Sequence, residues 1–283
     1  MPTKIPWTME TLNAHTGCSE CSTGCRECFA RKGSYRLECM GKEKYKGVTR
    51  KTENGIQWTG DVKFWPDVLK EPLRRKTPTT YFVNSMSDLF HPKVPFEEVD
   101  KLCEMMVDTQ HLHTYKLLTK RIDRALEYAE RWIDLTGEWP WGQNVHTGAS
   151  ICNQAEADKI IPILLQIPSA YRFISFEPLL ERIELRKDAW NSVLRPCSYY
   201  CDHDADGGGH RPEHGVNQII IGCERKHGNI AGRFQEGFID AAIDLVRQAD
   251  DAGVKVHVKQ IPINGRVVTT IKDFPRELQR RET

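Results

Sequence analysis

The chain has 283 residues, 39% of them hydrophobic, so it is long enough to bury one α/β barrel or two smaller domains. Its 40 Lys and Arg balance its 39 Asp and Glu, which excludes a global basic field and leaves a nucleic-acid partner only a local patch. No run of about eighteen apolar residues is present, and the first residues contain no apolar signal core. We therefore expect a cytoplasmic protein that does not associate with membranes, built as a single domain over residues 1–283.

Cysteines form the first motif along the chain. Ten cysteines without a secretion signal favour metal binding, because cytosolic reductants keep ordinary thiols reduced. The cluster formed by Cys18, Cys21, Cys25 and Cys28 contains two three-cysteine spacings. One is C-x6-C-x2-C from Cys18, and the other is C-x3-C-x2-C from Cys21, which is usual in radical S-adenosylmethionine enzymes. Three thiolates can hold a [4Fe–4S] cluster and leave one iron open for S-adenosylmethionine.

Zinc is the alternative ligand for these four cysteines, because tetrahedral zinc accepts C-x2-C pairs such as Cys18/Cys21 and Cys25/Cys28. The two pairs are separated by only three residues, whereas zinc ribbons join their pairs by a longer loop. The spacing therefore favours an iron–sulfur cluster over a zinc knot.

Beyond residue 75, short β-rich runs alternate with longer runs that place apolar residues at helical spacing. This alternation is typical of βα units around a parallel sheet, and it predicts a partial or complete α/β barrel. The predicted strands are Thr80–Asn84, Tyr115–Leu118, Asn144–Ala149, Arg172–Phe176, Gln218–Gly222 and Lys255–Lys259. The predicted helices are Phe96–Thr109, Arg121–Thr136, Asn153–Leu165 and Phe234–Ala252.

Polar and reactive side chains follow the predicted strands, at the ends that meet at one mouth of a parallel barrel. Helix capping explains Ser and Asp at such positions, but it does not call for Lys or Glu. We expect Lys120 and Lys259 to meet a phosphate or carboxylate as catalytic residues, and Glu177 and Glu224 to hold the ribose or amino group of a cofactor. The full set of expected cofactor-binding residues is Ser85, Asp88, Ser150, Glu177 and Glu224.

A Cys- and His-rich insert spans residues 195–216 and interrupts the βα pattern. Its side chains are of the kinds that zinc accepts, although no standard zinc spacing is matched. A polar, glycine-rich surface loop explains the segment equally well. The candidate zinc ligands are Cys197, Cys201, His203, His210 and His214.

Several motifs together carry a resemblance to a known family. They are Thr16-Gly17-Cys18, Gly24-Cys25-Arg26-Glu27-Cys28-Phe29-Ala30, Ser85-Met86-Ser87-Asp88-Leu89-Phe90-His91, Leu118-Thr119-Lys120-Arg121, Ser175-Phe176-Glu177-Pro178-Leu179-Leu180 and Val258-Lys259-Gln260. From Pro6 almost to its C-terminus the chain resembles the three-cysteine-motif proteins encoded by many bacteriophages and bacteria, a family regarded as radical SAM-like. The resemblance implies a (β/α) barrel of the radical SAM type with an N-terminal cluster-binding loop. It also implies cluster ligands at Cys18, Cys25 and Cys28. Cys21, the first cysteine of the usual radical SAM spacing, stays the competing ligand.

The same resemblance implies an enzyme that contains a [4Fe–4S] cluster and depends on S-adenosyl-L-methionine. Such an enzyme needs an electron donor and a small-molecule or nucleotide substrate, and the phage association suggests a nucleotide or a DNA base. The alternative from another functional class is a non-catalytic, zinc-stabilised nucleic-acid-binding or interaction module. The two differ in whether the N-terminal cysteines bind iron or zinc.

Overall fold

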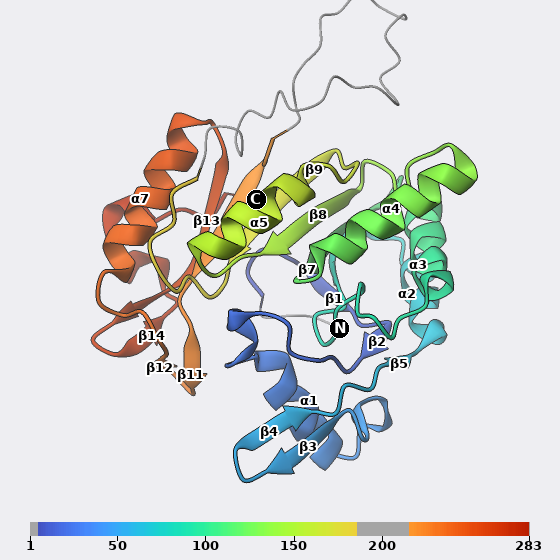
Figure 1. Ribbon diagram of the computed structural model, residues 1–283, viewed down its shortest axis with the longest axis horizontal. Helices are drawn as coiled ribbons and strands as arrows, with labels where there is room; N and C mark the ends of the chain where they lie inside the picture. The colour runs from blue at the N-terminus through green and yellow to red at the C-terminus, as the bar shows by residue number, and fades with distance from the viewer. Residues whose placement is uncertain (1–4, 186–214, 283) are drawn as a thin grey trace, which may run out of the picture.

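The computed structural model describes residues 5–185 and 215–282. One large sheet dominates the fold, and seven of its strands run parallel in their order along the chain (Figure 1). These strands are β1 (Glu10–Leu12), β6 (Thr79–Val83), β7 (His113–Thr119), β8 (Val145–Ser150), β9 (Tyr171–Phe176), β10 (Gln218–Gly222) and β13 (Lys255–Ile263).

Three short antiparallel strands extend the sheet beyond β13 to a total of ten strands: β14 (Arg266–Val268), β12 (Ile230–Ala231) and β11 (Arg225–His227). The two outermost strands, β1 and β11, do not pair with each other, so the described strands form a partial barrel rather than a complete one. Two small sheets precede β6. They pair β2 (His15–Thr16) with β5 (Lys63–Phe64), and β3 (Thr49–Thr52) with β4 (Gly55–Trp58).

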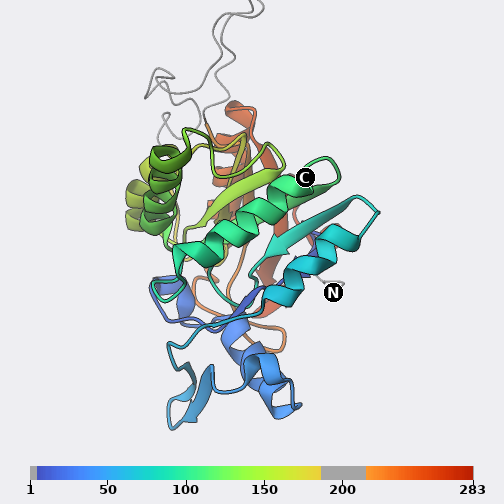
Figure 2. The ribbon, with the colours of Figure 1, turned by 90° about the vertical axis from the view of Figure 1, so that its right-hand side faces the viewer.

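Within residues 5–185 and 215–282, four helices follow parallel strands and cover the convex face of the sheet (Figure 2). They are α3 (Phe96–Asp108), α4 (Ile122–Thr136), α5 (Gln154–Leu164) and α7 (Phe238–Asp251). Local chemistry sets their ends: the Asn153 side chain accepts a hydrogen bond from the Glu156 N–H at the start of α5, and Gly137 ends α4 in the left-handed conformation. The other helices of the described residues are α1 (Phe29–Cys39), α2 (Lys70–Arg74) and the 3₁₀ helices Thr23–Cys25, Glu43–Tyr45, Pro66–Leu69, Ile271–Asp273 and Arg276–Leu278.

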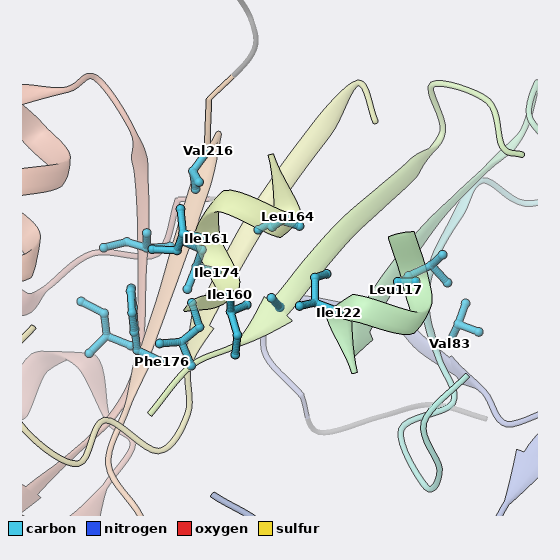
Figure 3. Close-up of a cluster of buried hydrophobic side chains, with 14 of the residues drawn as sticks. Val83, Leu117, Ile122, Ile160, Ile161, Leu164, Ile174, Phe176 and Val216 are labelled. Atoms are coloured by element: carbon cyan, nitrogen blue, oxygen red, sulfur yellow. The ribbon is translucent and has the colours of Figure 1, made fainter. Parts of the chain in front are cut away.

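Alternating residues of the strands serve two different cores. Leu117 of β7 and Ile174 of β9 pack under the helices, where Ile122 and Leu164 meet them (Figure 3). A separate cluster lines the concave face and consists of Trp7 from the N-terminal segment, Phe82 from β6, Phe173 from β9 and Ile220 from β10. The partial barrel is therefore packed on both faces of its sheet, and the strand ends carry the side chains that remain accessible at the mouth.

The predicted strands and helices are all present. The predicted strand Gln218–Gly222 matches β10 in both bounds, and most other bounds differ by one or two residues. The largest differences are at α7, which begins four residues after its predicted start, and at β13, which continues four residues beyond its predicted end. The zinc ligands predicted in the insert, from Cys197 to His214, lie outside the described residues. In the described parts of the chain, no helix is both long and apolar enough to cross a membrane.

Candidate functional site

The N-terminal cysteines lie on the loop that connects β2 to α1. Cys25 ends the short 3₁₀ helix Thr23–Cys25, and Cys28 immediately precedes α1. Cys25 is buried, Cys18 and Cys28 are half-buried, and Cys21 is exposed. Burial therefore separates Cys21 from the three cysteines that the family resemblance assigns as ligands.

Two glycines hold this loop against the rest of the fold. Gly17 has a φ of +95°, and a Cβ added there would lie 2.1 Å from the backbone oxygen of Asp61. A Cβ at Gly24 would lie 2.5 Å from the Cys152 sulfur, at the C-terminal end of β8. Position 17 therefore requires glycine because its φ is positive and because a side chain would collide with Asp61. Position 24 requires glycine because the loop passes close to the end of β8.

Electrostatic contacts among the thiols show that they share one environment. A hydrogen bond from Cys21 lowers the pKa of Cys25 to about 4, and burial raises the pKa of Cys18 to about 12. Burial also raises the pKa of Cys28. Thiolates are the ligands that iron–sulfur clusters require, and cluster binding at this loop would release the thiol protons. Among the described residues, however, no three Cys, His, Asp or Glu side chains are assembled in metal-binding geometry.

Arg121 connects the cysteine loop to Asp88. Its guanidinium lies 3.0 Å from Asp88 Oδ2, donates to the Ser19 carbonyl at 2.9 Å and lies 3.6 Å from the Cys18 sulfur. The Asp88 carboxylate also accepts hydrogen bonds from Thr119 Oγ1 at 2.7 Å and from the Lys120 N–H at 3.1 Å. In this structure, Asp88 positions Arg121, and Arg121 holds the loop around Cys18.

Lys120 places a second cation beside the thiols. Its ammonium donates to Ser150 Oγ at 2.7 Å. Burial lowers the pKa of Lys120, but the surrounding thiols of Cys152, Cys25 and Cys28 outweigh this effect and raise it overall. Two of the predicted site residues, Lys120 and Ser150, are thus brought together next to the cysteine loop.

Two further predicted residues meet at the ends of β9 and β13. The Lys259 ammonium lies 2.6 Å from Glu177 Oε1, and Ser175 Oγ donates to Glu177 Oε2 at 3.2 Å. A Cβ at Gly222 would lie 3.0 Å from Glu177 Oε1, so β10 also approaches this carboxylate closely. Glu177 keeps an exposed fraction of 14% and Lys259 one of 25%, which leaves both charges accessible from the mouth.

Glu224 is engaged by an arginine that the sequence did not single out. The Arg233 Nε donates to both carboxylate oxygens of Glu224, at 3.0 and 3.1 Å. The backbone N–H of Arg233 donates to Glu224 Oε2 at 2.8 Å. Burial raises the pKa of Glu224, but these bonds from Arg233 outweigh burial and lower it. Arg233 Nη2 also donates to the Thr23 carbonyl at 3.0 Å, so the pair supports the cysteine loop.

Ser85 makes its hydrogen bonds apart from the thiols of the loop. Its hydroxyl donates to Asn13 Oδ1 at 3.1 Å, and the Met86 N–H donates to the same oxygen at the same distance. Ser85 therefore joins the C-terminal ends of β1 and β6. Any cofactor contact by Ser85, Asp88 or Glu224 stays a prediction, and each of the three has protein partners in this structure.

Arg233 and Cys152 complete the site, and both could have been found only indirectly. Cys152 lies three residues after the predicted strand Asn144–Ala149, but an isolated cysteine most often serves as a small buried hydrophobe. Arg233 lies nine residues after Glu224, beyond the turn formed by β11 and β12. Its role depends on that turn bringing the guanidinium back to the carboxylate, which residue spacing does not reveal.

The fold is similar to that of spore photoproduct lyase. A tyrosine-to-phenylalanine mutant of that enzyme matches with a TM-score of 0.51 and 10% identity, over 93% of this chain and 79% of that chain. The lyase complexed with dinucleoside spore photoproduct matches with a TM-score of 0.44 and 11% identity, over 79% of this chain. A cysteine-to-serine mutant matches with a TM-score of 0.42. The alignment spans 58% of the length of each of these last two chains.

At this level of identity the similarity concerns the fold alone. No curated protein matches the chain. A family profile, in contrast, matches nearly the whole sequence, from residue 2 to residue 278. The chain belongs to the family described as "Protein of unknown function (DUF5131)".

Proposed function

We propose that this chain is an iron–sulfur enzyme that uses S-adenosylmethionine for radical chemistry. The observation that carries the proposal is the loop of Cys18, Cys25 and Cys28, placed at the mouth of a partial parallel barrel beside Lys120 and Arg121. Thiolates bring negative charge to the loop, and the two cations lie where they can offset it. A partial barrel with a cluster-binding loop is also what the family resemblance implies for a radical SAM enzyme.

Cys18, Cys25 and Cys28 would hold the cluster as three thiolate ligands. The exposure of Cys21 favours this set over the one that begins at Cys21. Three ligands leave one iron open, and S-adenosylmethionine bound there would supply radical chemistry that side chains do not perform. Arg121 would keep the Cys18 segment in place through its contacts with Ser19.

Glu177 is the residue we assign to S-adenosylmethionine. A carboxylate at the mouth can accept hydrogen bonds from the ribose or the ammonium group of the cofactor. Lys259 positions this carboxylate through the 2.6 Å ion pair and would meet the carboxylate of the cofactor or a substrate phosphate. Lys120 and Ser150 would line the side of the pocket nearest the thiols.

We propose a nucleotide or a DNA base as the substrate. Spore photoproduct lyase has been determined in complex with a dinucleoside photoproduct, and its fold is similar to that of this chain. The TM-score of 0.51 supports a common architecture, while the substrate is inferred from the family resemblance. Membership of the three-cysteine-motif group is part of the same proposal.

The test is cleavage of S-adenosylmethionine by anaerobically reconstituted protein. We expect a brown protein with a broad absorption band at about 400 nm. Dithionite should bleach this band, as it does for thiolate-ligated iron–sulfur clusters. Reduced protein should form 5′-deoxyadenosine and methionine slowly, even without substrate. A colourless protein fully occupied by zinc would contradict the proposal, as would a reducible cluster that neither binds S-adenosylmethionine nor forms 5′-deoxyadenosine.

A further inference from the structure

A basic lobe extends from the cysteine loop. It comprises residues 29–65 and contains α1, β3, β4 and β5 (Figure 1). Figure 2 shows the lobe projecting from the mouth side of the partial barrel, away from the helices of the convex face. Tyr45, Val48 and Trp58 form its small core, against which Cys18 and Cys28 pack. The lobe is thus joined directly to the proposed cluster ligands.

The lobe has a net positive charge, whereas the rest of the chain has a net negative charge. Residues 29–65 contain nine Lys or Arg and four Asp or Glu, a net charge of +5. Because the whole chain has a net charge of +1, the remaining residues carry −4. The balanced composition of the chain therefore conceals a separation of charge between the lobe and the barrel.

Several of these cations have no anionic partner. Within the described residues, the exposed side chains of Arg36, Lys42, Arg50 and Lys51 form no hydrogen bond or ion pair. Lobe carboxylates are directed elsewhere: Glu38 accepts from the Gly47 N–H at 2.8 Å, and Asp61 pairs with Lys93 at 2.8 Å. The unpaired cations lie on α1, the segment after it and the β3–β4 hairpin. Charge of this kind is complementary to a polyanion.

An exposed aromatic side chain marks the end of the lobe that is nearest the cysteines. Phe29 directly follows Cys28, begins α1 and is 62% exposed, while its neighbour Arg26 is also exposed. A large apolar ring in water beside cations is the combination on which bases of single-stranded nucleic acid stack. The eleven residues of α1 span about 16 Å, from Phe29 to the far end of the helix, which is long enough to follow several nucleotides of a strand.

We infer that the basic lobe binds a single strand of nucleic acid, with its phosphates on the lobe and a base at Phe29. This inference deepens the proposed function and rests on it, because the lobe leads the strand to the mouth where the cluster loop lies. Arg36, Lys42, Arg50 and Lys51 contact the backbone without reading sequence. Phe29 stacks on a base and selects unpaired over paired strands.

The experiment measures the binding of fluorescein-labelled oligonucleotides to the full-length chain by anisotropy, at salt concentrations from about 50 to 200 mM. The charge variant is Arg50→Glu/Lys51→Glu, and its control is Arg247→Glu/Lys272→Glu, which reverses two exposed cations on the barrel. We expect the lobe variant to bind single strands at least tenfold more weakly. We also expect the slope of log K against log salt to fall by about 1.4, for two lost phosphate contacts.

Phe29→Ala tests the stacking contact, and Met40→Ala controls for it because Met40, just after α1, is 64% exposed. Phe29→Ala should weaken single-strand binding about tenfold or more with an unchanged salt slope, while Met40→Ala should bind as the parent does. Equal losses in the lobe and barrel charge variants would overturn the inference. So would tighter binding of a duplex than of a single strand, or tighter binding of an acidic peptide than of either.

This assay needs neither iron nor S-adenosylmethionine, so the two proposals can fail separately. Each variant is also analysed for iron and for 5′-deoxyadenosine formation. If the protein cleaves S-adenosylmethionine but does not bind the oligonucleotide, the lobe inference alone is overturned. Lobe-dependent binding by a protein that contains no cluster would support the inference and remove the radical function.

Discussion

The Lys259 ammonium lies 2.6 Å from a carboxylate oxygen of Glu177, so β13 and β9 present opposite charges side by side at the mouth of the partial barrel. The pair is partly exposed, with 14% of Glu177 and 25% of Lys259 accessible. Partial exposure weakens the ion pair as a source of stability and leaves both groups available to a ligand. A pair placed in this way is suited to exchange partners when a charged cofactor binds.

Glu177→Gln should weaken the binding of S-adenosylmethionine without reducing iron content. A neutral amide still accepts one hydrogen bond, so the loss is the difference between a charge-assisted bond and a neutral one, about 1–1.5 kcal/mol or roughly tenfold in Kd. Equilibrium dialysis of anaerobic protein measures the change. Glu181→Gln is the matched control, because Glu181 is exposed and accepts from the Gln154 N–H. Equal affinities of the Glu177→Gln variant and the parent would remove Glu177 from the cofactor site.

Cys18→Ala should lose the cluster, whereas Cys21→Ala should keep it. A methyl group cannot replace a thiolate ligand, and the exposed Cys21 lies outside the buried or half-buried set of Cys18, Cys25 and Cys28. Iron and acid-labile sulfide per chain, counted after anaerobic reconstitution, distinguish the variants. The opposite result would favour the spacing that begins at Cys21, and loss in both variants would indicate four cysteine ligands.

Gly24→Ala should reduce cluster incorporation, because its new methyl group would lie 2.5 Å from the Cys152 sulfur and would displace the loop. Cys152→Ala in the same chain removes that sulfur and should restore iron. Gly33→Ala is the control, since its methyl group would meet only the flexible end of Met86 at 3.2 Å. Iron content and the cluster spectrum report the result, and a double variant as poor in iron as Gly24→Ala would show that the steric explanation is wrong.

The regular part of the fold was predictable because one signal dominates it. In β10, Ile219, Ile220 and Ile221 form a buried β-branched run, and both bounds of this strand were predicted. α7 begins later than predicted because Gly237, with a φ of 78°, precedes Phe238 in the left-handed conformation. The basic lobe was not predicted as structure, because its strands are short and depend on tertiary contacts of Trp58.

The candidate site was predictable to the extent that it follows strand ends. Lys120 and Ser150 end adjacent parallel strands, so the topology alone places them side by side. The contact of Arg233 with Glu224 instead depends on a turn whose conformation was not predicted. Contacts between side chains at the ends of adjacent parallel strands could therefore be predicted from the sequence. Contacts that depend on irregular segments could not.

His146 should make the stability of the fold depend on pH below neutrality. Burial lowers its pKa to about 4 from an ordinary value of 6.5, with Lys116 and Lys255 adding to the effect. Its ring stacks on Tyr171 with centroids 4.1 Å apart, and its Nδ1 is buried without a hydrogen-bond partner in the described structure. The folded state thus favours the neutral ring, whereas the unfolded chain takes up a proton as soon as the pH falls below about 6.5.

The sign follows from this difference: the unfolded state binds more protons between pH 6.5 and 4, so the free energy of unfolding decreases as the pH falls through that range. His146→Phe keeps the stacked ring and removes the titrating nitrogen. In this variant, the free energy of unfolding should depend less steeply on pH, by up to about 1.4 kcal/mol per pH unit, which corresponds to one proton. Its free energy of unfolding near pH 7 should change little. Urea unfolding of parent and variant, followed by circular dichroism at pH 7, 6 and 5, measures both slopes. If the slopes were the same, the pH dependence would belong to other buried histidines, such as His257, whose pKa burial also lowers to about 4.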